Sequence, residues 1–269
     1  MRSVISIPFA CALLIIASSC GRAVSSSPAR YPPSQYFNLG GWKLGLPVDS
    51  SGGTGGVNGI QFPAATISSS QLTAGFTNEF FYANSGGQLF FTAPSNGAVT
   101  TPGSGSDHTR SELREIYTGP GTDANNDWNS AIGGTLTATC SVLSVSANAS
   151  EATIGQIHNQ SVAFALLIYR PAQRDVALSL YTTLSSGVAQ RTSILGNIAF
   201  SDKITYSIVY SGNTLIATVN GTTQSFTVDS SWTGTPMYFK LGAYHSAPNI
   251  GNPSGDATQV IFSTFNVSH

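Results

Sequence analysis

The sequence predicts a single all-β domain with the architecture of a sandwich. Glycine and proline interrupt the chain about every ten residues, which is the usual spacing of turns in this fold class. The short runs between these interruptions are rich in β-branched and aromatic residues. Apolar residues rarely recur with the period of an amphipathic helix, so we expect at most one short helix, within Ser69–Phe80.

The expected strands can be placed one after another along the chain. Composition predicts strands at Gln88–Ala93, Thr135–Val145, Ala163–Tyr169, Ala177–Thr182, Thr205–Tyr210 and Gln259–Val267. The clearest local signal is a hairpin, in which Leu215–Val219 leads into Asn220-Gly221 and a second run of strand formers. Asn-Gly favours a type I′ turn because both residues tolerate positive φ angles. One β domain over residues 36–269 accounts for all of these elements.

Residues 1–23 have the pattern of a secretory signal peptide. A positive start at Arg2 precedes the apolar run Val4–Ala17, which is too short to span a bilayer, and small residues follow it. Cleavage near Ala23 or a few residues earlier would give a secreted, extracellular protein. A lipid anchor at Cys20 is the alternative, although alanine stands where such signals usually carry leucine.

The segment after the signal and the remaining cysteine complete the organisation. Residues 24–35 are rich in serine and proline and have no apolar period, so we expect a flexible leader. Cys11 and Cys20 would be removed with the signal. Cys140 would then be the one cysteine left, which excludes an internal disulfide. Its place in an apolar strand predicts a buried thiol.

The charge balance limits the partners. The chain carries 11 basic and 12 acidic residues, and two of the basic ones, Arg2 and Arg22, belong to the signal. The overall field therefore mildly repels polyanions, which argues against nucleic acid as a partner and requires a local basic cluster for any acidic ligand. We expect a monomer that binds neither nucleic acid nor membrane.

The first segment with chemical potential is Arg110–Glu115, which reads Arg-Ser-Glu-Leu-Arg-Glu. On a strand, Arg110, Glu112 and Arg114 share one face at intervals of about 6–7 Å, while Leu113 points to the core. Two guanidinium groups, each held by the one carboxylate, can bind a sugar carboxylate through paired hydrogen bonds. The alternative is a solvated ladder of salt bridges.

The second segment is Gln156-Ile157-His158, in which Gln156 and His158 share a face and Ile157 faces the core. A neutral imidazole can accept a proton at mild pH, and an amide can donate to a carboxylate. The alternative is an ordinary surface histidine.

The third segment is Tyr238–Tyr244, and it alternates cleanly. Tyr238, Lys240, Gly242 and Tyr244 share the polar face, so we expect them to face a groove. Gly242 has no side chain and would leave room there for a ligand. The alternative is an amphipathic strand with exposed aromatic residues.

Together the three segments supply the groups that an elimination beside a carboxylate requires. Removing the C5 proton of a uronate places negative charge on its carboxylate, which positioned donors must stabilise. A base takes that proton, and an acid protonates the departing O4. Cations near Tyr244 would lower its pKa below the ordinary value near 10, so this tyrosine could take part in the exchange.

The same three segments, in the same order, resemble the signature blocks of alginate lyases of polysaccharide lyase family seven. Trp42–Pro47 resembles the opening strand of that family. The resemblance implies a β-jelly roll of two curved antiparallel sheets with a concave substrate groove. It also implies β-elimination on alginate, an acidic polysaccharide, without a metal or other cofactor.

The resemblance also implies roles for individual residues. Four are expected to be catalytic: Tyr244, His158, Arg110 and Gln156. Four more are expected to bind substrate: Arg114, Lys240, Glu112 and Tyr238. Arg110 and Gln156 would neutralise the substrate carboxylate, and Glu112 would orient the arginines. His158 would be the base toward guluronate, with Tyr244 as the acid, and Tyr244 would serve as both toward mannuronate.

Two positions bear on substrate preference. His245-Ser246 replaces the usual Asn or Thr followed by Gln after the catalytic tyrosine, which alters one substrate contact. Ile157 is associated in the family with activity on stretches that contain guluronate, although it can act only by shifting its neighbours.

Three other functions remain open from the sequence. A non-catalytic carbohydrate-binding jelly roll would keep the groove without the reaction. A lyase for another polyuronate, such as a glucuronan, would need the same catalytic set. A glycoside hydrolase would need two carboxylates about 5–9 Å apart, whereas Glu112 and Glu115 lie on opposite faces of their strand.

Other polar residues receive structural interpretations. We expect His108 in a loop and His245 facing away from Tyr244. The acidic stretch Asp123–Asp127 lacks the glycine and glutamate of a calcium loop, so we expect a solvated loop that covers the groove as a lid.

Overall fold

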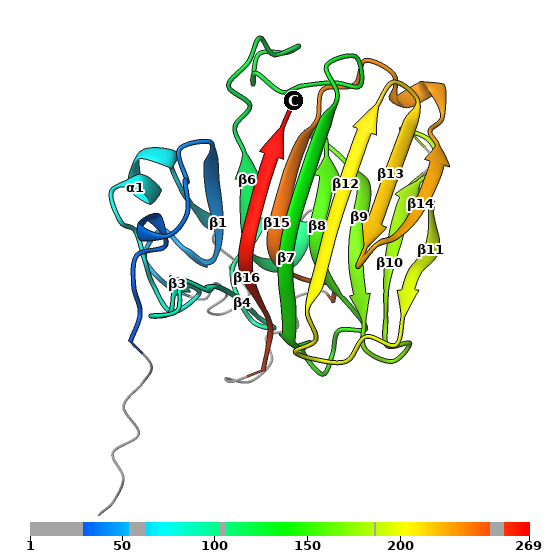
Figure 1. Ribbon diagram of the computed structural model, residues 1–269. Coiled ribbons are helices and arrows are strands. Elements are labelled where there is room, and N and C mark those ends of the chain that lie inside the picture. Colours follow the sequence, from blue (N-terminus) through cyan, green and yellow to red (C-terminus); the bar gives the residue numbers. More distant parts are fainter. Residues whose placement is uncertain (1–28, 54–62, 103–105, 186, 248–255) are drawn as a thin grey trace, which may run out of the picture.

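The computed structural model describes residues 29–53, 63–102, 106–185, 187–247 and 256–269. The proposed signal peptide and the first part of the leader lie outside these residues. The described residues form two antiparallel sheets packed face to face, and Figure 1 shows the seven-stranded sheet in front of the nine-stranded one. The all-β class predicted from the sequence is confirmed.

The nine-stranded sheet carries all three segments with chemical potential. Its path, as far as the structure describes the chain, runs β11-β10-β9-β8-β15-β6-β1-β2, and β5 pairs with β6 beside it. The strands are β1 (Trp42–Asp49), β2 (Ala64–Ile67), β5 (Val99–Thr101), β6 (Ser106–Glu115), β8 (Ala152–His158), β9 (Ala163–Arg170), β10 (Asp175–Tyr181), β11 (Ala189–Gly196) and β15 (Tyr238–His245).

The seven-stranded sheet covers the other side of the core. Within the described ranges its order is β14-β13-β12-β7-β16-β4-β3. The strands are β3 (Phe81–Ala83), β4 (Leu89–Pro94), β7 (Gly134–Ser144), β12 (Ile204–Ser211), β13 (Thr214–Val219), β14 (Thr222–Thr227) and β16 (Ala257–Ser268). Every strand predicted from composition is present, with both ends within two residues of the expected ones.

Two local predictions concern turns and helices. The hairpin between β13 and β14 turns at Asn220 and Gly221, whose φ angles of 45° and 85° are those of the expected type I′ turn. The one expected helix is α1 (Ser69–Thr73), which begins with a capping box at Ser68. It ends well before Phe80 because Gly75, with a φ of 98°, turns the chain away.

The described part of the leader differs from the expected flexible segment. Pro33–Gln35 form a 3₁₀ turn, η1, and a second one, η2, occupies Ser230–Trp232. Tyr31 exchanges backbone hydrogen bonds with Ala83 at the end of β3. From Tyr31 onward, the segment is therefore part of the folded domain.

Large apolar side chains fill the space between the sheets. Phe91 of β4 meets Phe262 of β16 edge to face at 5.4 Å, and Trp128 packs on Phe239 of β15 at 4.8 Å. Cys140 lies in this core as predicted, and burial raises the pKa of its thiol. Within the described residues, no helix is long and apolar enough to cross a membrane.

Candidate active site

A cavity of about 730 Å³ opens on the face of the nine-stranded sheet that points away from the core. It is lined by all eight residues that the sequence suggested for the site: Arg110, Glu112, Arg114, Gln156, His158, Tyr238, Lys240 and Tyr244. Residues far apart in the chain thus meet at one place. The cavity extends from β2 on one side to Tyr181 of β10 on the other.

Strand β15 places the three segments side by side, because it pairs with β8 on one edge and β6 on the other. Lys240 lies opposite Gln156 of β8 and also opposite Arg114 of β6. Toward one end of β15 Tyr238 lies opposite His158, and toward the other end Tyr244 lies opposite Arg110. The alternation of each segment therefore turns its polar residues to the same cavity.

Glu112 lies at the floor of the cavity and is only 2% exposed. Its two carboxylate oxygens contact the Lys240 ammonium and the Gln156 amide, which donates a hydrogen bond. Burial lowers the pKa of Lys240 to about 8, although Glu112 opposes this shift. The partners of Glu112 in the structure are therefore Lys240 and Gln156. The role suggested by the sequence, in which Glu112 orients the arginines, stays a prediction.

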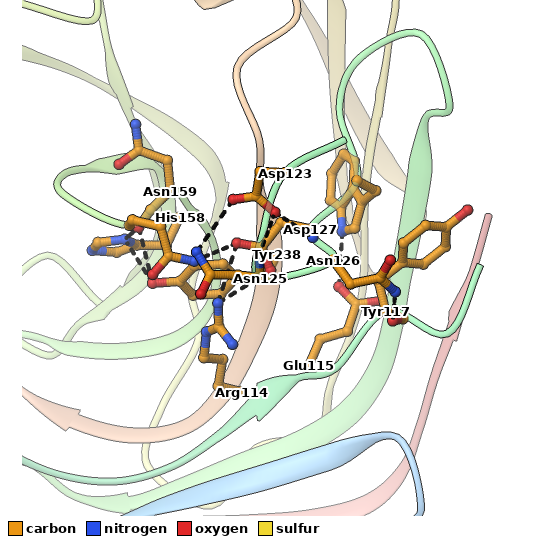
Figure 2. A network of polar contacts seen from close by, with 12 residues as sticks. Arg114, Glu115, Tyr117, Asp123, Asn125, Asn126, Asp127, His158, Asn159 and Tyr238 are labelled. Atoms are coloured by element: carbon orange, nitrogen blue, oxygen red, sulfur yellow. Dashed lines mark hydrogen bonds and ion pairs between the residues drawn. The ribbon is translucent and has the colours of Figure 1, made fainter. Parts of the chain in front are cut away.

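Arg114 is held by a different carboxylate from the expected one. Its Nη2 lies 3.1 and 3.2 Å from the two oxygens of Asp127. Its guanidinium lies 3.7 Å from the centre of the Tyr238 ring, and Figure 2 shows the two side chains next to each other. Asp127 is 1% exposed, so the prediction that it belongs to a solvated loop is wrong. Asp127 lies beneath the cavity wall, where the Arg114 guanidinium compensates its negative charge.

His158 is arranged to act as a neutral base. Its Nδ1 contacts the carbonyl oxygen of Asn159, which can only accept, so Nδ1 carries the proton. The Tyr238 hydroxyl donates to the same carbonyl at 2.9 Å. Burial, followed by the nearby Lys240 charge, lowers the pKa of His158 to about 3. At neutral pH the ring is therefore uncharged, with the lone pair on Nε2.

The pKa of Tyr244 differs from the expected one. The Arg110 guanidinium lies 4.7 Å from the centre of its ring and favours the phenolate. Burial acts in the opposite direction and is the larger effect, so the pKa of Tyr244 rises to about 12. The predicted lowering is wrong because loss of solvent outweighs one neighbouring cation. Tyr244 holds its proton at neutral pH.

Gly242 is required by the packing of neighbouring strands and does not make room for a ligand. A side chain there would place its first carbon 2.4 Å from the Ser111 carbonyl oxygen and 2.8 Å from the Glu112 Cα. Its φ of 147° is also rare for other residues. Close approach of β6 therefore requires this glycine, which lies where the pairing of β15 with β8 is irregular, and the expectation of room for a ligand is wrong.

Two other histidines lie near Tyr244. His108 belongs to β6 and not to a loop as predicted, and its ring lies 5.3 Å from that of Tyr244. His245 is 0% exposed and its Nδ1 lies 3.4 Å from Thr258 of β16, so it faces the core, as expected for the residue after Tyr244. Ile157 is likewise fully buried in the core.

Several lining residues did not emerge from the sequence. Lys43 lies opposite Arg114 on β1, and Gln160 follows β8. Leu166 and Tyr181 line the side formed by β9 and β10. Lys43 stands between the buried Trp42 and Leu44, so strand alternation could have revealed it. Gln160 and the two apolar residues carry no comparable local signal.

The carboxylates do not suit glycoside hydrolysis. Among the described lining residues Glu112 is the only carboxylate, and it is already paired with Lys240. Glu115 lies on the opposite face, where it accepts hydrogen bonds from Trp128 Nε1 and the Phe239 backbone amide. A hydrolase needs two carboxyl groups across the scissile bond.

The described residues include no group of three or more potential metal ligands. That the reaction needs no cofactor stays a prediction.

Comparison with known proteins identifies the group to which this fold belongs. A family model described as alginate lyase matches residues 37–269. The chain belongs to the alginate lyase family. An alginate lyase from Klebsiella pneumoniae is 28% identical over 95% of this chain and 97% of its own length. The protein is thus a polysaccharide lyase, and the resemblance drawn from the three segments is confirmed.

Solved structures of alginate lyases share the fold. The crystal structure of the Klebsiella pneumoniae alginate lyase has a TM-score of 0.72 at 27% identity and covers 88% of this chain and 98% of that chain. Alginate lyase A1-II′, a member of polysaccharide lyase family 7, has a TM-score of 0.72 at 23% identity, with the same coverage. The two antiparallel sheets of this alginate lyase family member are therefore those of the predicted jelly roll.

Proposed function

We propose that this polysaccharide lyase is secreted and cleaves alginate endolytically, by β-elimination in the cavity on the nine-stranded sheet. The observation that carries the proposal is the placement of a neutral His158 and a protonated Tyr244 in one cavity with Arg110. A base and an acid in opposite protonation states beside a carboxylate-binding cation are the groups that elimination needs.

The first step stabilises charge on the substrate carboxylate. As the C5 proton leaves, electron density moves onto the carboxylate, and Arg110 and Gln156 donate hydrogen bonds to it. Gln156 gives one amide hydrogen to Glu112, and the other remains for the substrate. The fixed partner prevents the amide from rotating, so the donor is in place before charge develops.

Proton transfer follows from the two protonation states. His158 Nε2 accepts the C5 proton of a guluronate, and the resulting imidazolium keeps its Nδ1 hydrogen bond to the Asn159 carbonyl. Tyr244 donates its hydroxyl proton to O4, and the C4–O4 bond breaks as the C4–C5 double bond forms. Toward mannuronate, Tyr244 would first have to lose its proton, which its raised pKa disfavours. We therefore propose a preference for guluronate, as Ile157 also suggests.

Endolytic cleavage and secretion rest on separate observations. Lining residues reach from Ala64 of β2 to Tyr181 of β10, so the cavity crosses the sheet and offers sites on both sides of the central strand β15. Relatives of the same fold have been crystallised with bound oligosaccharides: A1-II′ variants hold a GGMG substrate and a GGG product. The signal peptide expected over residues 1–23 supports secretion.

The test is ultraviolet absorbance of the purified protein with polyguluronate, polymannuronate and polyglucuronate in parallel. Elimination creates a double bond conjugated to the carboxylate, which absorbs, whereas hydrolysis creates none. We expect the fastest rise with polyguluronate, an early fall in viscosity, and about a 10²-fold lower turnover for Tyr244→Phe with unchanged folding. If the absorbance rises with polyglucuronate alone, the substrate is a glucuronan and not alginate. If folded protein produces no rise with any of the three polymers, lyase activity on them is contradicted.

A further inference from the structure

A buried carboxylate outside the expected site lies directly behind the cavity wall. Asp127 sits in the segment that connects β6 to β7 and is 1% exposed. It contacts two cavity-lining side chains, Arg114 of β6 and Gln160 after β8. Figure 2 shows it pointing toward Arg114, beside the Tyr238 ring. One acidic group thus connects two elements that form separate parts of the wall.

The backbone around Asp127 is fixed from both sides. Its own amide donates to the Asp123 carboxylate at 2.9 Å, and Thr122 donates to its carbonyl at 2.8 Å. The next residue, Trp128, exchanges two backbone hydrogen bonds with Met237, which precedes Tyr238 on β15. The carboxylate is therefore held at a defined place relative to the catalytic strand.

Two constraints determine the orientation of Arg114. The Asp127 oxygens engage its Nη2 in the guanidinium plane, and the Tyr238 ring lies against the guanidinium face at 3.7 Å. An in-plane partner and a facial partner together leave little rotational freedom. Because Nη2 is engaged, the other amino group of the fork remains to bind a substrate carboxylate. The Arg114 side chain is only 15% exposed, which strengthens such a contact.

Gln160 is oriented by the same carboxylate. Its Nε2 donates to Asp127 Oδ2, so its carbonyl oxygen points elsewhere and can accept from a sugar hydroxyl. Arg114 and Gln160 therefore present one donor and one acceptor from opposite sides of a common anchor. This pair matches a uronate, which carries a carboxylate and ring hydroxyls.

We propose that Asp127 is a positioning residue that holds Arg114 and Gln160 as the recognition pair for the uronate next to the scissile bond. The inference rests on the proposed function for its substrate class. Asp127 touches neither the substrate nor the reacting atoms and acts through Arg114 and Gln160. Its effect is therefore mainly on substrate binding, with a smaller effect on turnover through Tyr238, whose hydroxyl lies 3.3 Å from His158 Nδ1.

The test is a double-mutant cycle with Asp127→Asn and Arg114→Gln, measured on polyguluronate. Asp127→Asn keeps the shape and removes the charge, and we expect KM to rise about tenfold while kcat falls no more than about threefold. In the Arg114→Gln background, the same change should cost clearly less than in the wild type, because only the effect that passes through Gln160 remains. The control is Asp229→Asn, which removes a carboxylate that caps η2 and does not line the cavity.

Three outcomes would overturn the proposal: fully additive losses in the cycle, a KM unchanged by Asp127→Asn, or an equal rise in KM for Asp229→Asn. If Asp127→Asn fails to fold, Asp127→Glu gives the same test, because the longer side chain keeps the charge and displaces the guanidinium.

The proposal can also be tested without any sugar. In the ligand-free protein, side-chain NMR should show slow rotation of the Arg114 guanidinium in the wild type and fast rotation in Asp127→Asn. Unchanged rotation would overturn the positioning role even if the enzyme cleaves alginate. Loss of the slow rotation would support that role even if no polyuronate were cleaved, so the two proposals fail separately.

Discussion

Strand β6 carries two buried glutamates, three residues apart, on opposite faces of one sheet. Glu112 is 2% exposed and Glu115 is 4% exposed. Glu112 faces the cavity and contacts Lys240 and Gln156, which line it too. Glu115 faces the core, where Trp128 and the Phe239 amide donate to it at 2.8 and 2.9 Å, and His269 lies 2.6 Å away.

The difference lies in what the partners can do besides holding the carboxylate. The partners of Glu115 do not line the cavity of the candidate site, and the donors that they give to Glu115 serve the fold. Gln156 and Lys240 keep further donors that face the substrate space. The same residue type, equally buried, therefore fixes the fold on one face and orders the site on the other. Substitutions on the two faces should separate activity from stability.

The largest expected effect is on the cavity face, at Arg110→Ala. This change removes the cation beside Tyr244 that stabilises charge developing on the substrate carboxylate. We expect kcat to fall about 10³-fold, which corresponds to about 4 kcal/mol of transition-state stabilisation. The melting temperature should change by no more than about 2 °C, since the guanidinium lies at a cavity and not in the core. Ultraviolet kinetics on polyguluronate and a thermal melt measure both.

A raised KM with unchanged kcat would instead make Arg110 a residue that only binds substrate. A large loss of stability with it would remove the distinction between the two faces.

The next effect is on the core face, at Glu115→Gln. The neutral amide cannot accept from all of the donors around it, and it places an NH₂ group among them. We expect a loss of about 3 kcal/mol in the free energy of unfolding, the cost of removing one partner from a buried polar network. Denaturant unfolding measures this. Below the unfolding transition, kcat should stay within about threefold of the wild type.

The converse result, a tenfold lower kcat with wild-type stability, would show that Glu115 acts on catalysis through its neighbour Arg114.

The faces of each segment were predictable because strand alternation is a local property. Arg110, Gln156 and Tyr244 could be assigned to the cavity from period two alone, and the buried Ile157 to the core. The order of β8, β15 and β6 in the sheet is not local. The combined chemistry of the three segments suggested one site, and the resemblance to a family supplied the groove in which they meet.

Three features depended on distant contacts or on burial, which the sequence does not encode locally. The pairing of Asp127 with Arg114 joins a loop to a strand across a chain separation that no short motif marks. Gly242 is required by the approach of β6, its neighbour in the sheet. The raised pKa of Tyr244 depends on how much solvent the fold removes, and this outweighs the visible cation.

The smallest expected effect concerns the pH dependence of stability on the core face. His269 Nδ1 faces the Gly133 carbonyl at 2.8 Å and Nε2 faces Glu115, so both ring nitrogens meet acceptors and the charged ring is favoured. Burial alone would lower the pKa of His269, but these hydrogen bonds raise it above its ordinary value near 6.5. A raised pKa in the folded state stabilises the protein below pH 6.5, and this contribution is lost as pH rises through the raised value.

The measurement is denaturant unfolding of the wild type and His269→Gln at pH 6 and pH 9. At pH 6 the variant should be less stable by about 1 kcal/mol, the usual net contribution of one hydrogen bond. As the pH rises toward 9 the wild-type ring loses its proton, so the difference should shrink. Subtracting the variant cancels His158, whose lowered pKa acts in the opposite sense. A difference that stays constant or grows toward pH 9 would mean that His269 is held as a neutral ring, and Glu115 would then lack the cationic partner that the core face supplies.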